Sequence, residues 1–150
     1  MDEPLPLADA QHFIARHYGH RASELTLLGA GEWSRAYAFR LDGEAAVVRF
    51  GAHGEDFAKD QIMASFSSPS LPIPRVIEYG RAPQGYFVVS ERCHGVALDD
   101  LDETGMRAVL PGLLKMMDAI RDIEVSASRG YGIWTPAGID PQSRYMSFLR

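Results

Sequence analysis

A glycine loop followed by a tight hairpin does most to restrict what this chain can fold into. Gly29 and Gly31 lie between two runs of alternating apolar residues, and Asp42-Gly43 then supplies a two-residue turn. The next run ends at Arg49. Small loop residues let backbone N–H groups approach phosphate oxygens, and a cation on the following strand can bind the same phosphates. This order favours a nucleotide-phosphate site over the plain hairpin turn that two glycines alone would indicate.

The composition is that of a folded domain. Of the 150 residues, 46% are hydrophobic and 23% are charged, and the formal net charge is −5. Basic residues are scattered, so we expect neither a nucleic-acid partner nor a membrane partner. There is no long apolar run and no secretory signal pattern, which favours a cytoplasmic protein. The single cysteine, Cys93, cannot form an internal disulfide, and no cysteine–histidine cluster has zinc-ligand spacing.

Apolar residues at helical spacing predict a helix from Leu7 to Tyr18, after which the period changes to that of strands. A second helix is expected over residues 56–66, between the third and fourth strands. Turn residues separate the expected strands, which cover residues 25–28, 35–41, 45–50, 75–79 and 86–91. We therefore expect an α+β fold in which one helix interrupts a five-stranded, mostly antiparallel sheet.

The second part of the chain has a helical pattern. Residues 106–120 carry a long apolar stripe, with Thr104 as its expected cap and Pro111 as an expected kink or fresh start. Glycines and prolines predict a loop over residues 129–142, and another apolar pattern begins at Ser143. The expected organisation is an N-terminal helix over 1–22, a nucleotide-binding small lobe over 23–94, and a hinge with the start of a helical large lobe over 95–150.

Arg49 is the cation best placed to bind phosphates. Side chains two residues apart on a strand share a face, so Val47 would lie beside Arg49 and cover a purine ring. Such a cation needs an orienting carboxylate, and the following helix contains Glu55, Asp56 and Asp60. We favour Asp60, because an arginine–aspartate pair spans about the same gap as the lysine–glutamate pair of protein kinases. The alternative is that Asp60 is only solvated.

The segment after the fifth strand is expected to cross between lobes and to place its backbone against a nucleobase edge. His94 does not begin a His-x-Asp catalytic element, because Val96 stands where the aspartate would be. We predict no catalytic residue and no metal ligand in the chain. The candidate nucleotide-binding residues are Gly29, Gly31, Ser34, Val47, Arg49, Asp60, Ser90, Glu91, Arg92 and Cys93.

Several short motifs make residues 8–150 resemble the aminoglycoside phosphotransferase family. They are Gly31-Glu32, Ser34-Arg35-Ala36, Val48-Arg49, Phe57, Lys59-Asp60, Leu71-Pro72-Ile73-Pro74, Gly95-Val96, Asp100-Leu101, Met117-Asp118-Ala119-Ile120 and Gly130-Tyr131-Gly132. The resemblance implies a two-lobed protein-kinase-like fold, here the small lobe followed by the first helices of a truncated large lobe. It implies ATP or GTP with Mg²⁺ as the donor, and as the acceptor a hydroxyl of an aminoglycoside antibiotic such as hygromycin B.

The residues that carry out phosphoryl transfer in this family are missing from the sequence. The family's His-x-Asp-x-x-x-x-Asn loop and its later magnesium-binding aspartate match no segment of the chain. We therefore expect a fragment that holds the nucleotide-binding half of a small-molecule kinase and is inactive alone. Two alternatives are a non-catalytic nucleotide-binding or interaction module that is naturally truncated, and a kinase of another small alcohol. An apolar face left exposed by truncation would favour self-association.

Overall fold

The structure is a computed structural model, and it describes residues 5–31, 34–124, 134–135 and 138–139. The chain divides into two compact units. The first contains Met1–Ala64 and Pro74–Arg92, and the second contains Ser65–Ile73 and Cys93–Arg150. The expected helix from Ser143, the expected loop apart from four of its residues, and the loop residues Glu32 and Trp33 lie outside the described ranges.

The first unit is built on a five-stranded antiparallel sheet, as the sequence predicts. Its strands are β1 (Ala22–Ala30), β2 (Ser34–Leu41), β3 (Glu44–Gly51), β4 (Val76–Ala82) and β5 (Gly85–Glu91). They lie in the order β1-β2-β3-β5-β4, so β3 occupies the centre and β1 and β4 form the edges. The helices of this unit are α1 (Leu7–Tyr18), the short η1 (Gly19–Arg21) and α2 (Gly54–Ala64).

Two glycine turns set the register of the sheet. At the β2–β3 hairpin, Asp42 and Gly43 have φ angles of 53° and 86°, the positive values that the Asp-Gly pair predicts. At the β4–β5 hairpin, Gly85 has a φ of 128°, and a Cβ atom there would lie 2.5 Å from the carbonyl oxygen of Gly51. Only glycine fits the second turn without displacing the backbone of β3.

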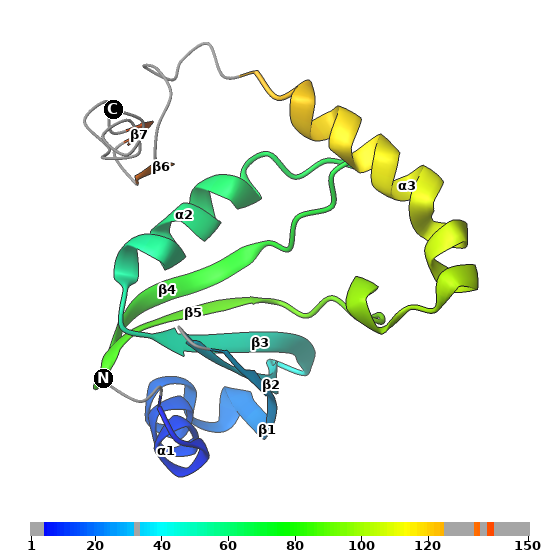
Figure 1. Cartoon of the computed structure of the whole chain (residues 1–150). Coiled ribbons are helices and arrows are strands. Elements are labelled where there is room, and N and C mark those ends of the chain that lie inside the picture. The colour runs from blue at the N-terminus through cyan, green and yellow to red at the C-terminus, as the bar shows by residue number, and fades with distance from the viewer. Residues whose placement is uncertain (1–4, 32–33, 125–133, 136–137, 140–150) are drawn as a thin grey trace, which may run out of the picture. The chain divides into compact units, whose positions relative to one another are not determined.

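The two faces of the sheet are chemically different. The face beneath α1 carries large side chains that are almost fully buried: Tyr37, Phe39, Val48, Phe50, Phe87 and Val89. Helix α1 packs on them through Ala10, Ile14 and Tyr18, which recur at helical spacing. Figure 1 shows α1 and α2 on opposite sides of the sheet. The hydrophobic core therefore lies between the sheet and α1, and the face of the sheet toward α2 is not part of this core.

Polar contacts fasten α1 to distant parts of the first unit. The hydroxyl of Tyr18 donates to Glu78 of β4 over 2.7 Å, and the Nε2 atom of His17 lies 2.7 Å from the other oxygen of the same carboxylate. Tyr37 donates to the carbonyl oxygen of Leu5 over 2.6 Å. Because these bonds link residues far apart in sequence, they fix where α1 sits on the sheet.

The second unit is described mainly through α3 (Glu103–Arg121), which follows the short η2 (Leu98–Asp100). The helix begins two residues earlier than expected: its cap is Asp102, whose carboxylate accepts from the N–H of Gly105 over 2.7 Å, and the prediction of Thr104 was wrong. Pro111 lies inside the helix and does not end it. The unit also contains the two-residue strands β6 (Trp134–Thr135) and β7 (Gly138–Ile139).

Several apolar side chains of α3 are exposed; they are Met106, Val109, Leu110, Leu114, Met117 and Ile120. We call these residues the α3 stripe. Length and hydropathy together exclude a membrane span for every helix in the part of the chain that the structure describes.

Candidate functional site

Arg49 lies near the end of the central strand β3, on the face of the sheet that α2 covers. Its side chain and that of Asp60 in α2 are each 37% exposed, and Arg49 Nη2 donates to Asp60 Oδ2. The ion pair expected from the sequence is therefore formed. Of the other two carboxylates weighed for this role, Asp56 instead pairs with Lys59 over 3.3 Å.

Helix α2 brings an aromatic ring to the same place. The Cζ atom of Arg49 lies 5.5 Å from the centre of the Phe57 ring, which is only 4% exposed. Phe57 and Asp60 are three residues apart and so share one face of the helix. A cavity of about 200 Å³ opens at this point, lined by Ser34, Arg49, Gly51, His53, Asp56, Phe57 and Asp60.

The glycine loop joins the two strands beside this cavity. Gly29 pairs with Ala36 in the β1–β2 ladder, and Ala36 in turn pairs with Arg49 in the β2–β3 ladder. The N–H of Gly31 donates to the carbonyl oxygen of Ser34 over 2.9 Å, which closes the loop at its base. Ser34 then begins β2 and lines the cavity. The structure therefore brings Ser34, Arg49 and Asp60 together, with the glycine loop one strand away from Arg49.

Small side chains cover the sheet around Arg49. Directly paired residues of an antiparallel ladder share a face, so Val47 and Arg49 lie on one face with their partners Ala38, Ala36, Ser90 and Val88. None of these neighbours is larger than valine, whereas the opposite face is mostly aromatic. The face that carries Val47 and Arg49 is therefore lined by small side chains.

The four residues expected at the hinge are Ser90, Glu91, Arg92 and Cys93; the first two end β5 and the other two follow it. Ser90 lies opposite Val47 in the β3–β5 ladder, and the N–H of Arg92 donates to the carbonyl oxygen of Ala45 over 3.2 Å. The carboxylate of Glu91 accepts from Arg75 over 2.8 Å, and this bond lowers the pKa of Glu91. Cys93 is an exposed free thiol at the start of the second unit's longer segment. The Glu91 side chain is thus engaged by Arg75.

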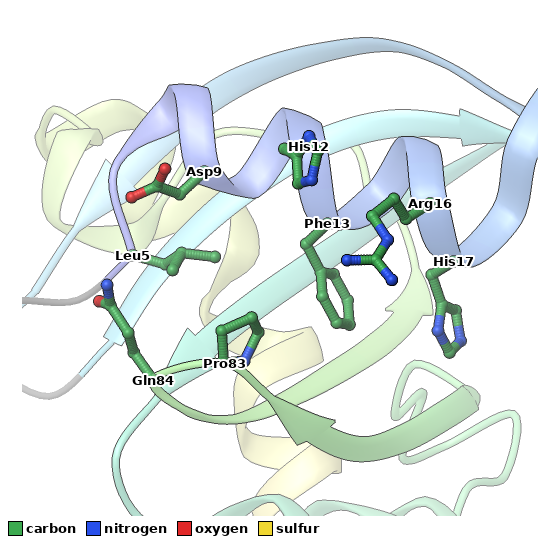
Figure 2. A pocket seen from close by; sticks show the side chains of 8 residues that line it. All are labelled: Leu5, Asp9, His12, Phe13, Arg16, His17, Pro83 and Gln84. Atoms are coloured by element: carbon green, nitrogen blue, oxygen red, sulfur yellow. The ribbon is translucent and has the colours of Figure 1, made fainter.

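A larger cavity, of about 580 Å³, lies on the other face of the sheet, under α1. Figure 2 shows Phe13 and Arg16 extending from α1 toward Pro83 and Gln84 of the β4–β5 turn. It contains none of the residues that the sequence predicts to bind nucleotide. We place the candidate site at the smaller cavity, because that one combines an oriented cation with a glycine loop.

Four residues of the smaller cavity were not among the candidates from the sequence: Gly51, His53, Asp56 and Phe57. Gly51 is the last residue of β3, and His53 lies in the connection from β3 to α2, whose course the sequence does not reveal. The position of Phe57 near the site could have been predicted from the sequence, because it stands three residues before Asp60 and so shares a face of the expected helix with it. Throughout the described ranges, no group of three or more histidine, cysteine, aspartate or glutamate residues is arranged to hold a metal ion.

Comparisons with known proteins show which sequences and which solved structures the chain is similar to. No protein-family model matches the chain. The chain is 36% identical over 129 residues to hygromycin-B 4-O-kinase of Escherichia coli, which covers 85% of this chain and 38% of that protein. Among solved structures it is similar to aminoglycoside phosphotransferase APH(4)-Ia, with 32% identity and a TM-score of 0.85 over 96% of this chain and 49% of that one. The resemblance to the aminoglycoside phosphotransferase family is confirmed.

The similarity extends to the N-terminal half of the aminoglycoside phosphotransferase structures, and it includes the kinase-like arrangement of sheet and helices. A thermostable mutant of APH(4)-Ia in ternary complex with AMP-PNP and hygromycin B has a TM-score of 0.83 at 34% identity, over 94% of this chain and 48% of that one. Another mutant of the same aminoglycoside phosphotransferase was solved with ADP and hygromycin B. The chain spans about half the length of these structures, or less.

Proposed function

We propose that this chain supplies the nucleotide-binding part of an aminoglycoside O-phosphotransferase. In that reaction the γ-phosphate of a nucleoside triphosphate is transferred to a hydroxyl of the antibiotic. The observation that carries the proposal is the Arg49–Asp60 pair on the small-residue face of the sheet, next to a glycine loop. The complexes of APH(4)-Ia with AMP-PNP or ADP support a nucleotide ligand, and those with hygromycin B support an aminoglycoside acceptor.

The roles of the individual residues follow from their chemistry. A guanidinium group has five N–H donors, and Arg49 gives one of them to Asp60, so donors remain for phosphate oxygens. Asp60 holds the guanidinium in place and partly offsets its charge. The small residues of the glycine loop would let its backbone approach the phosphates closely. Val47 provides an apolar surface for the purine ring.

The proposal assigns no magnesium ligand to this chain, because the family's magnesium-binding aspartate matches no segment of the sequence. When bound with the triphosphate, Mg²⁺ would neutralise phosphate charge. The residues here bind and orient the donor. A chain of this sequence alone is expected to bind nucleotide without measurable transfer to hygromycin B, because it has no His-x-Asp element.

Calorimetric titration of the full 150-residue chain with Mg²⁺–ATP tests the proposal. We expect saturable binding that Arg49→Ala weakens by about 10- to 100-fold, since hydrogen bonds to charged groups contribute about 1.5–3 kcal/mol. Titration with Mg²⁺–GTP in parallel identifies the preferred base.

Arg21→Ala is the matched control. Arg21 also forms an ion pair, with Asp42 over 2.6 Å, but it lies outside the cavity. The variant should bind ATP like the wild type. If Arg49→Ala binds ATP as tightly as Arg21→Ala does, Arg49 does not bind the phosphates and the proposed site is wrong.

A further inference from the structure

Phe57 lines the candidate site, but the proposed function gives it no role. It is an aromatic residue in the first half of α2, it is almost fully buried, and it lines the same cavity as Arg49. A leucine or methionine would fill a buried position on a helix equally well. The reason for a ring here must therefore be sought in what the ring contacts.

The ring lies under the guanidinium group of Arg49. The distance from Cζ to the ring centre is 5.5 Å, within the range of a cation–π contact. The Arg49 side chain is 37% exposed whereas Phe57 is 4% exposed, so the cation has the ring on one side and solvent on another. Arginine favours this arrangement because its planar, weakly hydrated cation stacks well on aromatic faces.

The hydrogen bond to Asp60 does not fix Arg49 by itself. Among the described residues, Arg49 bonds to Asp60 through Nη2 and one carboxylate oxygen, Oδ2, rather than in the two-pronged geometry that would hold the guanidinium plane. A single contact leaves the group free to turn about the bonded nitrogen. The ring of Phe57 removes this freedom, because turning would move the cation off the ring face.

The neighbouring charges on α2 strengthen this interpretation. Asp56 also lines the cavity and would compete with Asp60 for the guanidinium, but it is paired with Lys59. Helix α2 thus offers Arg49 one carboxylate and one ring, three residues apart on the same face. Together they hold the cation from two directions.

We propose that Phe57 is a positioning residue, whose ring orients the Arg49 guanidinium so that its unused N–H groups meet the phosphates of the nucleotide. This inference rests on the proposed function for its ligand. The contact between ring and cation is nevertheless a property of the protein without nucleotide, and it can be measured separately.

The first measurement uses the nucleotide-free full chain. In the NMR spectrum, the Arg49 Nε–H proton should show a ring-current shift that is lost in Phe57→Leu and in Phe57→Met and kept in Phe57→Tyr. Having two aliphatic variants protects the test against one that fails to fold. An Arg49 resonance that is the same in wild type and in both aliphatic variants would overturn the inference.

The second measurement compares the affinities of Mg²⁺–ATP and of adenosine, which has no phosphates. A cation–π contact of about 1 kcal/mol predicts that Phe57→Leu weakens ATP binding about 5-fold and leaves adenosine binding unchanged, with Phe57→Tyr close to wild type. In an Arg49→Ala background, Phe57→Leu should cause no further loss.

The outcomes separate the two proposals. If wild type binds ATP but Phe57→Leu weakens ATP and adenosine equally, the ring only supports the fold and the inference fails alone. Equal losses in Phe57→Tyr and Phe57→Leu would also overturn it. If wild type binds no ATP, the proposed function fails together with the phosphate role of Phe57, whatever the NMR result.

Discussion

Arg49 and Asp60 form the pair that the sequence indicates because both lie where local periodicity fixes the direction of a side chain. Alternation along β3 places Arg49 on the face opposite the aromatic core, and helical spacing places Asp60 on the face of α2 that looks at it. Whether these residues bind nucleotide remains a prediction. What the residue pattern did not reveal was the engagement of Glu91, the last residue of β5, by Arg75, which directly precedes the neighbouring strand β4.

A prediction at this scale concerns Tyr18 and alkaline pH. Burial of Tyr18, with a further contribution from its hydrogen bond to Glu78, raises the pKa of the phenol above its ordinary value of about 10. The stabilisation is therefore fully present below about pH 10 and is lost as the pH rises toward the folded-state pKa. Urea unfolding of wild type should show a free energy of unfolding that falls as the pH rises above about 10.

Tyr18→Phe should flatten this alkaline decrease and should cost about 1 kcal/mol at neutral pH, where the hydrogen bond to Glu78 is lost. Tyr79→Phe serves as the control, because Tyr79 is 40% exposed on the edge strand β4. An unchanged alkaline decrease in Tyr18→Phe would show that another group is responsible.

At the scale of elements, the strands and helices were predictable where period and turn chemistry agree. The Asp42-Gly43 turn and the alternation around it locate the β2–β3 hairpin, and the structure has the positive φ angles that the pair implies. The start of α3 was misplaced, because Asp102 and Thr104 are both acceptable caps and only the hydrogen bond to Gly105 distinguishes them. Local sequence signals indicate that a helix begins here, but they locate its first residue only to within about two positions.

The β4–β5 turn gives a prediction for one residue. Gly85→Ala should lower the free energy of unfolding by at least about 2 kcal/mol, because the new Cβ would combine a strained φ with a contact against the Gly51 carbonyl oxygen. Urea unfolding monitored by circular dichroism measures this loss.

Gly43→Ala is the matched comparison for Gly85→Ala. Gly43 also has a positive φ, but nothing lies within 4 Å of a Cβ added there, so only the strain applies, at about 1 kcal/mol. If both variants lose the same free energy of unfolding, the contact between a Cβ at position 85 and the Gly51 carbonyl oxygen has no energetic cost, and the prediction for Gly85→Ala is wrong.

At the scale of the whole molecule, the fold class followed from the sequence because the order of elements was clear. The cavity beside Arg49 was not predictable in detail, since it depends on how the β3–α2 connection brings His53 and Phe57 beside residues of β2 and β3. Such tertiary placement carries no local sequence signal.

The α3 stripe gives a prediction at the same scale. Leu114, Met117 and Ile120 are 53%, 57% and 50% exposed, and apolar surface of this kind favours association. We expect sedimentation velocity to show concentration-dependent self-association of the chain, reduced in the double variant Leu114→Gln/Met117→Gln. Lys115→Gln, at an exposed polar position of the same helix, should behave like wild type. A chain that stays monomeric at high concentration would contradict this expectation.

The path of the chain between the two units has a practical consequence. The chain leaves the first unit after Ala64, re-enters it at Pro74 and leaves it again after Arg92. No choice of stop codon can therefore release the sheet with α1 and α2 alone, because Ser65–Ile73 is embedded within that stretch. A minimal nucleotide-binding module would need this segment replaced by a designed linker. By the same connectivity, one protease cut in that segment would leave the two units still covalently joined at Arg92–Cys93.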